Sequence, residues 1–119
     1  MSIKKITLAE MADALHLKVL CGRDMLDRTV CGGYASDLLS DVIAHAKKGD
    51  VWITLQVHPN IVAVAVLKEI AGVIFVNERE PEKETIDKAK AEGIPLFSST
   101  LTAYEIAGRL YERGIHGQR

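Results

Sequence analysis

Polar side chains that could bind a small ligand follow three apolar segments of this 119-residue sequence. They supply amides, hydroxyls and one imidazole: Gln56, His58, Asn60, Asn77, Ser98, Ser99 and Thr100. In open parallel sheets, ligands bind beyond the carboxyl ends of the strands, and backbone N–H groups at the following helix starts attract anions. The alternative is that these residues only form turns and helix caps, their ordinary use in loops.

A second candidate is the segment Asp27-Arg28-Thr29, followed by the pair Gly32-Gly33. The guanidinium of Arg28 could clamp a carboxylate or a phosphate through parallel hydrogen bonds. Glycines would let such a ligand approach the backbone closely. The alternative is a turn with an ion pair and a glycine bulge, and the spacing alone favours this second interpretation.

Motifs for catalysis or cofactor binding are missing from the sequence. It has no Gly-Lys-Ser or Gly-Lys-Thr phosphate loop and no dinucleotide fingerprint. Its histidines lie in different predicted elements without metal-binding spacing, so we expect neither a metal nor another cofactor. We therefore expect no enzyme. One alternative is a small enzyme that uses His58 with Ser98, Ser99 or Thr100, although no partner for the imidazole is evident. Another is a purely structural subunit of a larger assembly.

Charge and hydropathy narrow the range of partners. The net charge is −1, with 15 basic and 16 acidic residues mixed along the chain, so no basic stripe for nucleic acid is present. No apolar run approaches the roughly 18 residues that span a bilayer, and no apolar leader follows Met1. These features predict a cytoplasmic protein, in which Cys21 and Cys31 stay reduced.

Periodicity and capping residues indicate the elements that position the candidate sites. Thr7 and Glu10 predict a capping box at the start of the first helix. Asp37 and Asn60 are expected to cap two later helices, and Thr102 with Glu105 predicts another capping box. Strands are predicted at 17–21, 30–34, 51–55, 73–76 and 96–97, and later helices at 38–46, 61–70, 81–92 and 103–111. Strand and helix alternate from residue 51, which predicts parallel crossovers. The fold class is therefore α/β: a helix-covered, mainly parallel sheet in a three-layer single domain over residues 1–119.

The segment Ile61 to Leu67 contains only apolar side chains. A helix on the outside of a sheet normally exposes one face, and large apolar patches are uncommon on monomers. We therefore expect a homodimer with two-fold symmetry that covers this helix. The alternative is that the N-terminal helix and residues 17–34 cover it within one chain.

Five stretches spread over nearly the whole chain form a further pattern: Asp27 to Gly33, Asp37 to Val42, Trp52 to Asn60 with Ala63 to Leu67, Gly93 to Leu96 and Glu105 to Leu110. In these stretches the chain resembles the DRTGG domain family. Val30-Cys31 separates the threonine from the two glycines, a departure from the residue run that names the family.

The family is similar to the N-terminal domain of HPr kinase/phosphorylase, whose kinase chemistry belongs to a separate P-loop domain that this sequence lacks. It also occurs inside some phosphotransacetylases and nucleotide-regulated pyrophosphatases. The resemblance implies a non-catalytic regulatory or protein-interaction module. Its partner would be a second protein or a small anionic or nucleotide-like ligand.

Overall fold

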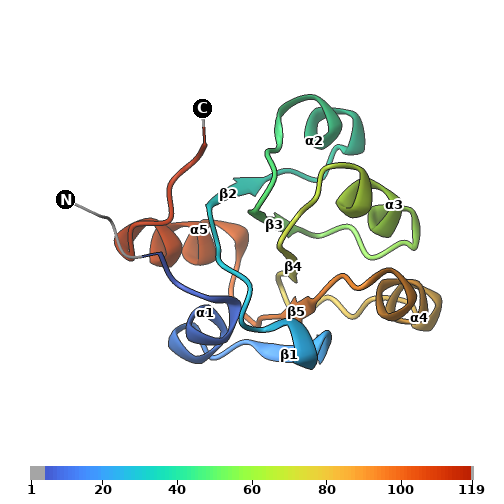
Figure 1. The fold of residues 1–119 in the computed structure, drawn as a ribbon, viewed down its shortest axis with the longest axis horizontal. Helices are drawn as coiled ribbons and strands as arrows, with labels where there is room; N and C mark the ends of the chain where they lie inside the picture. The colour runs from blue at the N-terminus through green and yellow to red at the C-terminus, as the bar shows by residue number, and fades with distance from the viewer. Residues whose placement is uncertain (1–4, 119) are drawn as a thin grey trace.

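The computed structural model describes residues 5–118, which contain a five-stranded sheet (Figure 1). The strands are β1 (Lys18–Cys21), β2 (Gly32–Ala35), β3 (Asp50–Thr54), β4 (Gly72–Phe75) and β5 (Leu96–Ser98). Their order across the sheet is β1-β5-β4-β3-β2. Strands β2 to β5 are parallel, and β1 pairs antiparallel with β5 at one edge. The predicted mainly parallel α/β sheet is confirmed.

Helices cover both faces of this sheet. The helices are α1 (Leu8–Ala14), α2 (Leu39–His45), α3 (Asn60–Leu67), α4 (Lys83–Glu92) and α5 (Ala103–Glu112), with a short 3₁₀ turn, η1 (Arg23–Met25). Figure 1 shows α1 and α5 on one side of the strands and α2, α3 and α4 on the other. The three predicted layers are therefore present, as expected when strands and helices alternate along the chain.

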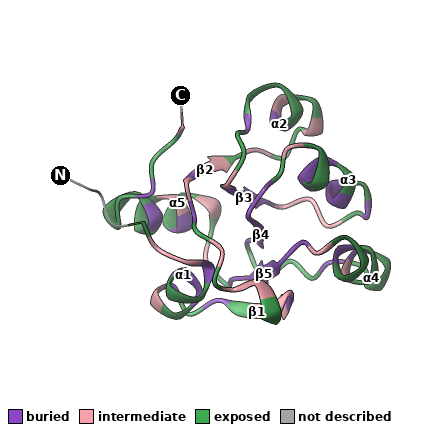
Figure 2. Cartoon of the chain, viewed as in Figure 1, coloured by how far each residue is buried: buried purple, intermediate pink, exposed green. Residues whose placement is uncertain are grey.

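Alternating side chains of the central strands fill two cores, one on each face. Val51 and Ile53 of β3 join the core beneath α1 and α5, whereas Trp52 between them joins the core beneath α2, α3 and α4. In β4, Ile74 and Phe75 divide in the same way. Successive strand side chains point to opposite faces, so a strand covered on both sides is apolar throughout. Figure 2 shows these central strands as buried.

Two of the predicted helix caps are present. Glu10 N–H donates to Thr7 Oγ1 at 3.1 Å, and Thr7 N–H donates to Glu10 Oε1 at 3.0 Å, which completes the predicted capping box. Thr102 Oγ1 accepts from Glu105 N–H at 3.3 Å at the start of α5. These side chains satisfy backbone donors that have no partner within the first helical turn.

Two other predicted caps are wrong. The residue that caps α2 is Leu38, because the carboxylate of Asp37 is bound instead by the loop after β3. The residue that precedes α3 is Pro59, and Asn60 is already the first helical residue. Asn60 N–H donates to His58 Nδ1 at 3.1 Å, so the imidazole replaces the expected amide cap.

The apolar segment at residues 61–67 is helical, as predicted, and one of its faces reaches the surface. Ile61, Val62, Val64 and Ala65 are buried against the sheet and its neighbouring helices. Val66 is 41% exposed and Leu67 is 65% exposed, so the alternative that other elements of the same chain cover this helix completely is wrong. The surrounding elements cover the inner part of α3 and leave a narrow apolar ridge.

Candidate functional site

The two groups of residues singled out in the sequence lie at opposite ends of the parallel strands. We call the side of the sheet where these strands end the carboxyl edge, and the side where they begin the amino edge. Ser98 ends β5, and Gln56, Asn77 and Ser99 follow strands, so this group occupies the carboxyl edge. Arg28 and Thr29 precede β2 and share their cavity with residues that precede β3, β4 and β5, so they occupy the amino edge. The two groups therefore form two separate candidate sites.

At the carboxyl edge, a hydrogen-bonded cluster around Asp37 joins the loops after β2 and β3. Asp37 Oδ1 accepts from the hydroxyl of Thr54 at 2.9 Å and from Leu55 N–H at 2.7 Å. The Gln56 side-chain amide donates to the backbone oxygen of Asp37 at 2.8 Å. Thr54 is only 1% exposed, and its hydroxyl also accepts from Gln56 N–H at 3.1 Å, so the Asp37 carboxylate is the acceptor for the buried Thr54 O–H.

The other polar residues of the carboxyl edge are bound in turns. Ser99 Oγ accepts from Leu101 N–H at 3.0 Å, and Asn77 N–H donates to the backbone oxygen of Leu101 at 2.9 Å. Asn77 has a left-handed φ of 57°, a conformation that asparagine tolerates better than most residues. His58 is exposed and bound to the start of α3, as described above, and Thr100 is exposed. The structure thus brings these loops together and binds the side chains of Gln56, His58 and Ser99 to backbone groups of the same edge.

Arg28, at the amino edge, is held by its backbone and extends its side chain over a neighbouring methionine. Its N–H donates to the backbone oxygen of Met25 at 3.2 Å, and its own backbone oxygen accepts from Leu8 N–H at 2.9 Å. The guanidinium Nη2 lies 3.1 Å from Met25 Sδ. The Met25 side chain in turn packs close to Gly93 at the end of α4. The arginine is therefore partly buried, and the Met25 side chain contacts its guanidinium and helps to orient it.

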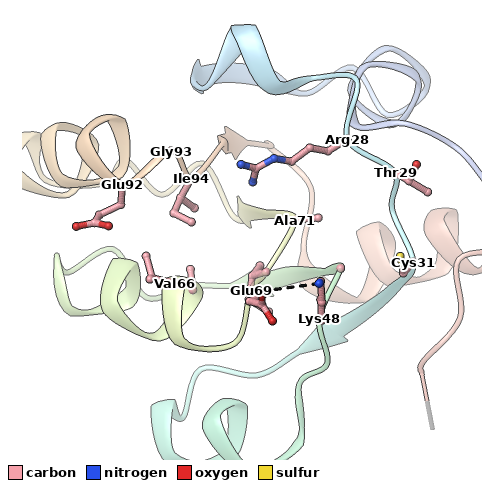
Figure 3. A pocket seen from close by; sticks show the side chains of 13 residues that line it. Arg28, Thr29, Cys31, Lys48, Val66, Glu69, Ala71, Glu92, Gly93 and Ile94 are labelled. Carbon is pink, nitrogen blue, oxygen red and sulfur yellow. Dashed lines mark ion pairs between the residues drawn. The ribbon is translucent and has the colours of Figure 1, made fainter.

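A cavity of about 600 Å³ opens beneath this guanidinium (Figure 3). Its lining comes from the loop before β2, the turn before β3, and the ends of α3 and α4: Arg28, Thr29, Cys31, Lys48, Gly49, Ala65, Val66, Glu69, Ile70, Ala71, Glu92, Gly93 and Ile94. Figure 3 shows Arg28 reaching over the cavity from one side, with Val66 and Glu69 of the α3 region on the other. The lining combines apolar side chains with a few charged groups, as ligand pockets commonly do.

The charged groups around the cavity differ in how they are paired. Lys48 Nζ lies 3.8 Å from Glu69 Oε1, and both side chains are more than half exposed, so the pair is loose. Within residues 5–118, no carboxylate oxygen lies within 4.0 Å of the Arg28 guanidinium. The carboxylate of Glu92 likewise has no basic group within that distance in the same part of the chain. Arg28 is therefore a partly buried cation whose neighbours leave it without an anion, contrary to the ion pair considered for this turn.

Gly32 and Gly33 lie against the C-terminal residues 116–118 and do not line the cavity. A Cβ atom at Gly32 would lie 2.6 Å from Gln118 Cγ and 2.8 Å from Asp50 Oδ1. Gly33 N–H donates to the backbone oxygen of His116 at 3.1 Å, and the His116 ring stacks on Tyr111 of α5. The close approach expected at these glycines is therefore occupied by residues 116–118. Asp27 is exposed and does not line the cavity.

Nearby, burial raises the pKa of the Cys21 thiol, and a backbone hydrogen bond at Leu96 and the charge of Lys90 oppose that effect. Cys21 Sγ donates to the backbone oxygen of Ile94, on the strand side of the cavity. Cys31 is less buried and lines the cavity itself, with Lys5 Nζ at 3.9 Å from its sulfur. Across residues 5–118, no group of three or more His, Cys, Asp or Glu side chains is arranged to hold a metal ion.

Sequence reasoning found Arg28 and Thr29 but missed most of the cavity lining. Lys48, Gly49, Glu69 and Gly93 lie in turns that precede strands, and Glu92 is the last residue of α4. The available signal was the position of Arg28 itself, because a residue that precedes one parallel strand lies beside the turns that precede its neighbours. The polar residues of the sequence instead favoured the carboxyl edge, where ligands of open sheets bind.

Comparison with known proteins identifies a domain family and a solved structure of similar fold. Residues 10–112 match the family model of the DRTGG domain. One similar solved structure contains the CBS and DRTGG domains of the regulatory region of Clostridium perfringens pyrophosphatase, complexed with its activator, diadenosine tetraphosphate. The TM-score is 0.70 at 16% sequence identity, over 87% of this chain and 45% of that one. At this identity the likeness establishes the fold, and the chain spans less than half of that structure. No curated protein matches the chain significantly.

Proposed function

Because this chain belongs to the DRTGG domain family, we propose that it is a non-catalytic regulatory module that binds a small anionic ligand in the amino-edge cavity. The similar structure from Clostridium perfringens supports a regulatory role, since it comes from a regulatory region and was complexed with an activator. In residues 5–118, no helix is long and apolar enough to cross a membrane. The proposal places the module in the cytoplasm, where the thiols of Cys21 and Cys31 stay reduced.

The main support for this proposal is that the Arg28 guanidinium has no anionic partner among the described residues. A guanidinium is always charged and presents several N–H donors in a planar fork that suits carboxylates and phosphates. In this structure it is partly buried and fixed by Met25, yet its neighbours supply no anion. A ligand anion in the cavity would form charge-assisted hydrogen bonds with a donor that is already oriented. Thr29, on the same loop, adds a hydroxyl to the lining.

The rest of the cavity indicates what else the ligand carries. Ile70, Ala71 and Ile94 form apolar parts of its surface, and the volume of about 600 Å³ lies within the range of about 300–1,000 Å³ common for small-molecule sites. An anionic group joined to a flat apolar body would therefore satisfy both parts of the lining. A nucleoside monophosphate has this chemistry, and the activator of the similar pyrophosphatase region is also a nucleotide.

The proposal assigns a different task to the carboxyl-edge residues. Gln56 and Ser99 already form hydrogen bonds within that edge, as does Asn77 through its backbone. We therefore propose that this group holds the loops together, and that Arg28 and Thr29 are the ligand contacts among the residues singled out in the sequence.

Self-association is the second part of the proposal. The exposed ridge of Val66 and Leu67 borders a groove between α3 and α4, and we propose that a second copy of the chain covers it. Sedimentation equilibrium at micromolar concentration should give twice the monomer mass of 13.0 kDa. A monomer mass throughout the accessible concentration range would contradict this part and leave the ligand site unaffected.

Isothermal titration with AMP as the probe tests the ligand site. Arg28→Ala should weaken AMP binding about 10- to 150-fold, the equivalent of about 1.5–3 kcal/mol for a hydrogen bond to a charged group. The AMP affinity of Arg28→Lys should lie between those of the wild type and Arg28→Ala, because lysine keeps the charge and loses the planar fork. Arg109→Ala, an exposed arginine on α5, is the matched control and should bind like the wild type. Undetectable AMP binding by the wild type, or equal affinity in Arg28→Ala, would overturn the proposal.

A further inference from the structure

Two hollows on the α3–α4 side of the molecule have residues in common. The first is the Arg28 cavity, and the second is a groove of about 760 Å³ between α3 and α4. The groove is lined by Pro59, Asn60, Val62, Ala63, Val66, Leu67, Lys88, Ala91 and Glu92. Val66 and Glu92 line both hollows. Figure 3 shows these two residues on the same side of the Arg28 cavity, at the ends of α3 and α4.

The groove has an apolar ridge beside it and charges of opposite sign along one wall. Leu67 is 65% exposed, which makes it a protruding apolar side chain next to a hollow that could receive one like it. Such a self-complementary patch is what a two-fold interface requires, because the same surface serves both copies.

The charges on α4 favour a second copy as the occupant. Lys88 and Glu92 are one helical turn apart, so an antiparallel pairing of two α4 helices brings Lys88 of each copy to Glu92 of the other. Lys88 Nζ lies 3.8 Å from Glu84 Oε1, but both side chains are largely exposed, so this ion pair is weak. Lys88 can therefore exchange it for an ion pair with Glu92 of the second copy. Glu92 has no basic group within 4.0 Å in residues 5–118, and the second copy would supply one.

We propose that ligand binding and self-association are positively coupled through the wall formed by Val66 and Glu92, an inference that rests on the proposed function. A second copy seated in the groove packs against this wall and closes the adjoining side of the Arg28 cavity. A ligand beneath Arg28 contacts Val66 and Glu92 from within the cavity. The dimer would hold these two side chains in place, so the ligand would bind the dimer more tightly than the monomer. Linkage requires reciprocity: if each of the two sites in the dimer binds the ligand more tightly than the monomer does by a given factor, saturating ligand strengthens the dimer by the square of that factor.

The test measures both sides of this linkage with AMP as the probe. Sedimentation velocity across a concentration series should show a tighter dimer when AMP is saturating, by a factor of about five or more. Leu67→Lys places a charge on the ridge outside the Arg28 cavity, so it should abolish the dimer and weaken AMP binding by the square root of that factor. Leu38→Lys is the matched control, because Leu38 is 64% exposed on the turn before α2 and lines neither hollow. It should preserve both properties.

The outcomes separate failure of the coupling from failure of the ligand site. If wild-type protein binds AMP and Arg28→Ala does not, but Leu67→Lys binds AMP as tightly as the wild type, the site stands and the coupling is wrong. A dimer that AMP leaves unchanged or weakens also overturns the coupling. If AMP does not bind to the wild type, or binds independently of Arg28, the proposed function fails first and the coupling fails with it.

Discussion

The carboxyl edge and the amino edge of the parallel strands both carry polar side chains, but these groups differ in what they bind. At the carboxyl edge, Asp37 and Gln56 form hydrogen bonds that join the loops after β2 and β3, and Ser99 forms one within its own turn. At the amino edge, Arg28 faces a cavity, and none of its described neighbours supplies an anion. Residue type alone would rank the first edge higher. The comparison teaches that a candidate group must also have bonding capacity left over.

The physical reason is the cost of exchanging partners. A group that already has a hydrogen bond gains little when a ligand replaces it, because one bond is lost for each bond formed. A fixed charged donor without an anion gains a charge-assisted bond and loses only its contacts with water. The predictions below test whether the two edges differ in this way, beginning with the largest effect.

Asp37→Ala should have the largest effect on stability and none on the ligand. The change removes the acceptor of the Thr54 hydroxyl and of Leu55 N–H, so the free energy of unfolding should fall by about 2 kcal/mol. Urea denaturation measures this loss. Asp37→Asn, which keeps an acceptor oxygen, should lose less. AMP affinity should stay at the wild-type value in both variants, and a marked loss in either would place ligand binding at the carboxyl edge.

Gly32→Ala and Gly33→Ala should differ although the two glycines are adjacent. A Cβ atom at Gly32 would lie too close to Gln118 and Asp50, so this variant should lose about 1–3 kcal/mol through overpacking. The Cβ atom at Gly33 meets its nearest neighbour at 3.8 Å, so alanine there should leave stability unchanged or raise it by up to about 1 kcal/mol. Equal effects in thermal or urea unfolding would contradict the role given to residues 116–118.

Alkylation of the two cysteines should report on occupancy of the cavity. Cys31 lines the cavity, so saturating AMP should slow its reaction with iodoacetamide in proportion to the unoccupied fraction of sites. Cys21 is buried with a raised pKa, so it should react slowly with or without AMP and serves as the internal control. Mass spectrometry of peptides resolves the two sites. An unchanged Cys31 rate at a concentration where titration shows saturation would place AMP elsewhere.

The smallest effect concerns pH, near the carboxyl end of β2. The hydrogen bond from the Tyr34 hydroxyl lowers the pKa of Asp41, with smaller contributions from Ser36 and His45. A pKa lowered in the folded state gives stability above the ordinary value of 3.8, which is lost as the pH falls through the folded value. Tyr34→Phe should therefore be slightly less stable than the wild type at pH 7, and the difference should shrink below about pH 4. A difference that is constant across this range would mean that the bond does not affect the ionisation.

Much of the fold follows from the sequence because its signals are local or periodic. The capping box at Thr7 and Glu10 depends on residues three apart, and the middle of the buried strand β3, Val51 to Ile53, is apolar because both faces of the sheet are covered. The caps at Asp37 and Asn60 failed for a different reason. The Asp37 carboxylate accepts from the Thr54 hydroxyl on another loop, and Asn60 N–H donates to the His58 ring in the same turn. The rules for helix caps anticipate neither contact.

The candidate site was only partly predictable from the sequence. Arg28 stood out by its charge and its place in a motif, but the cavity beneath it is built from turns far apart in the chain, such as those at Lys48 and Gly93. The glycine pair was associated with a ligand because close approach to the backbone is a known use of glycine. Here that space is filled by the C-terminal residues, a long-range contact that only the folded chain reveals.

The most direct test of the difference between the two edges is to map AMP onto the backbone amides by NMR. The account predicts that chemical shifts change at Thr29, Gly49, Ile70 and Gly93 around the cavity, and that Arg28→Ala abolishes these changes. Amides at the carboxyl edge, including those of Gln56, Asn77 and Ser99, should not respond. Shifts concentrated at the carboxyl edge that persist in Arg28→Ala would contradict the account and return the ligand site to the end of the sheet where the sequence first indicated it.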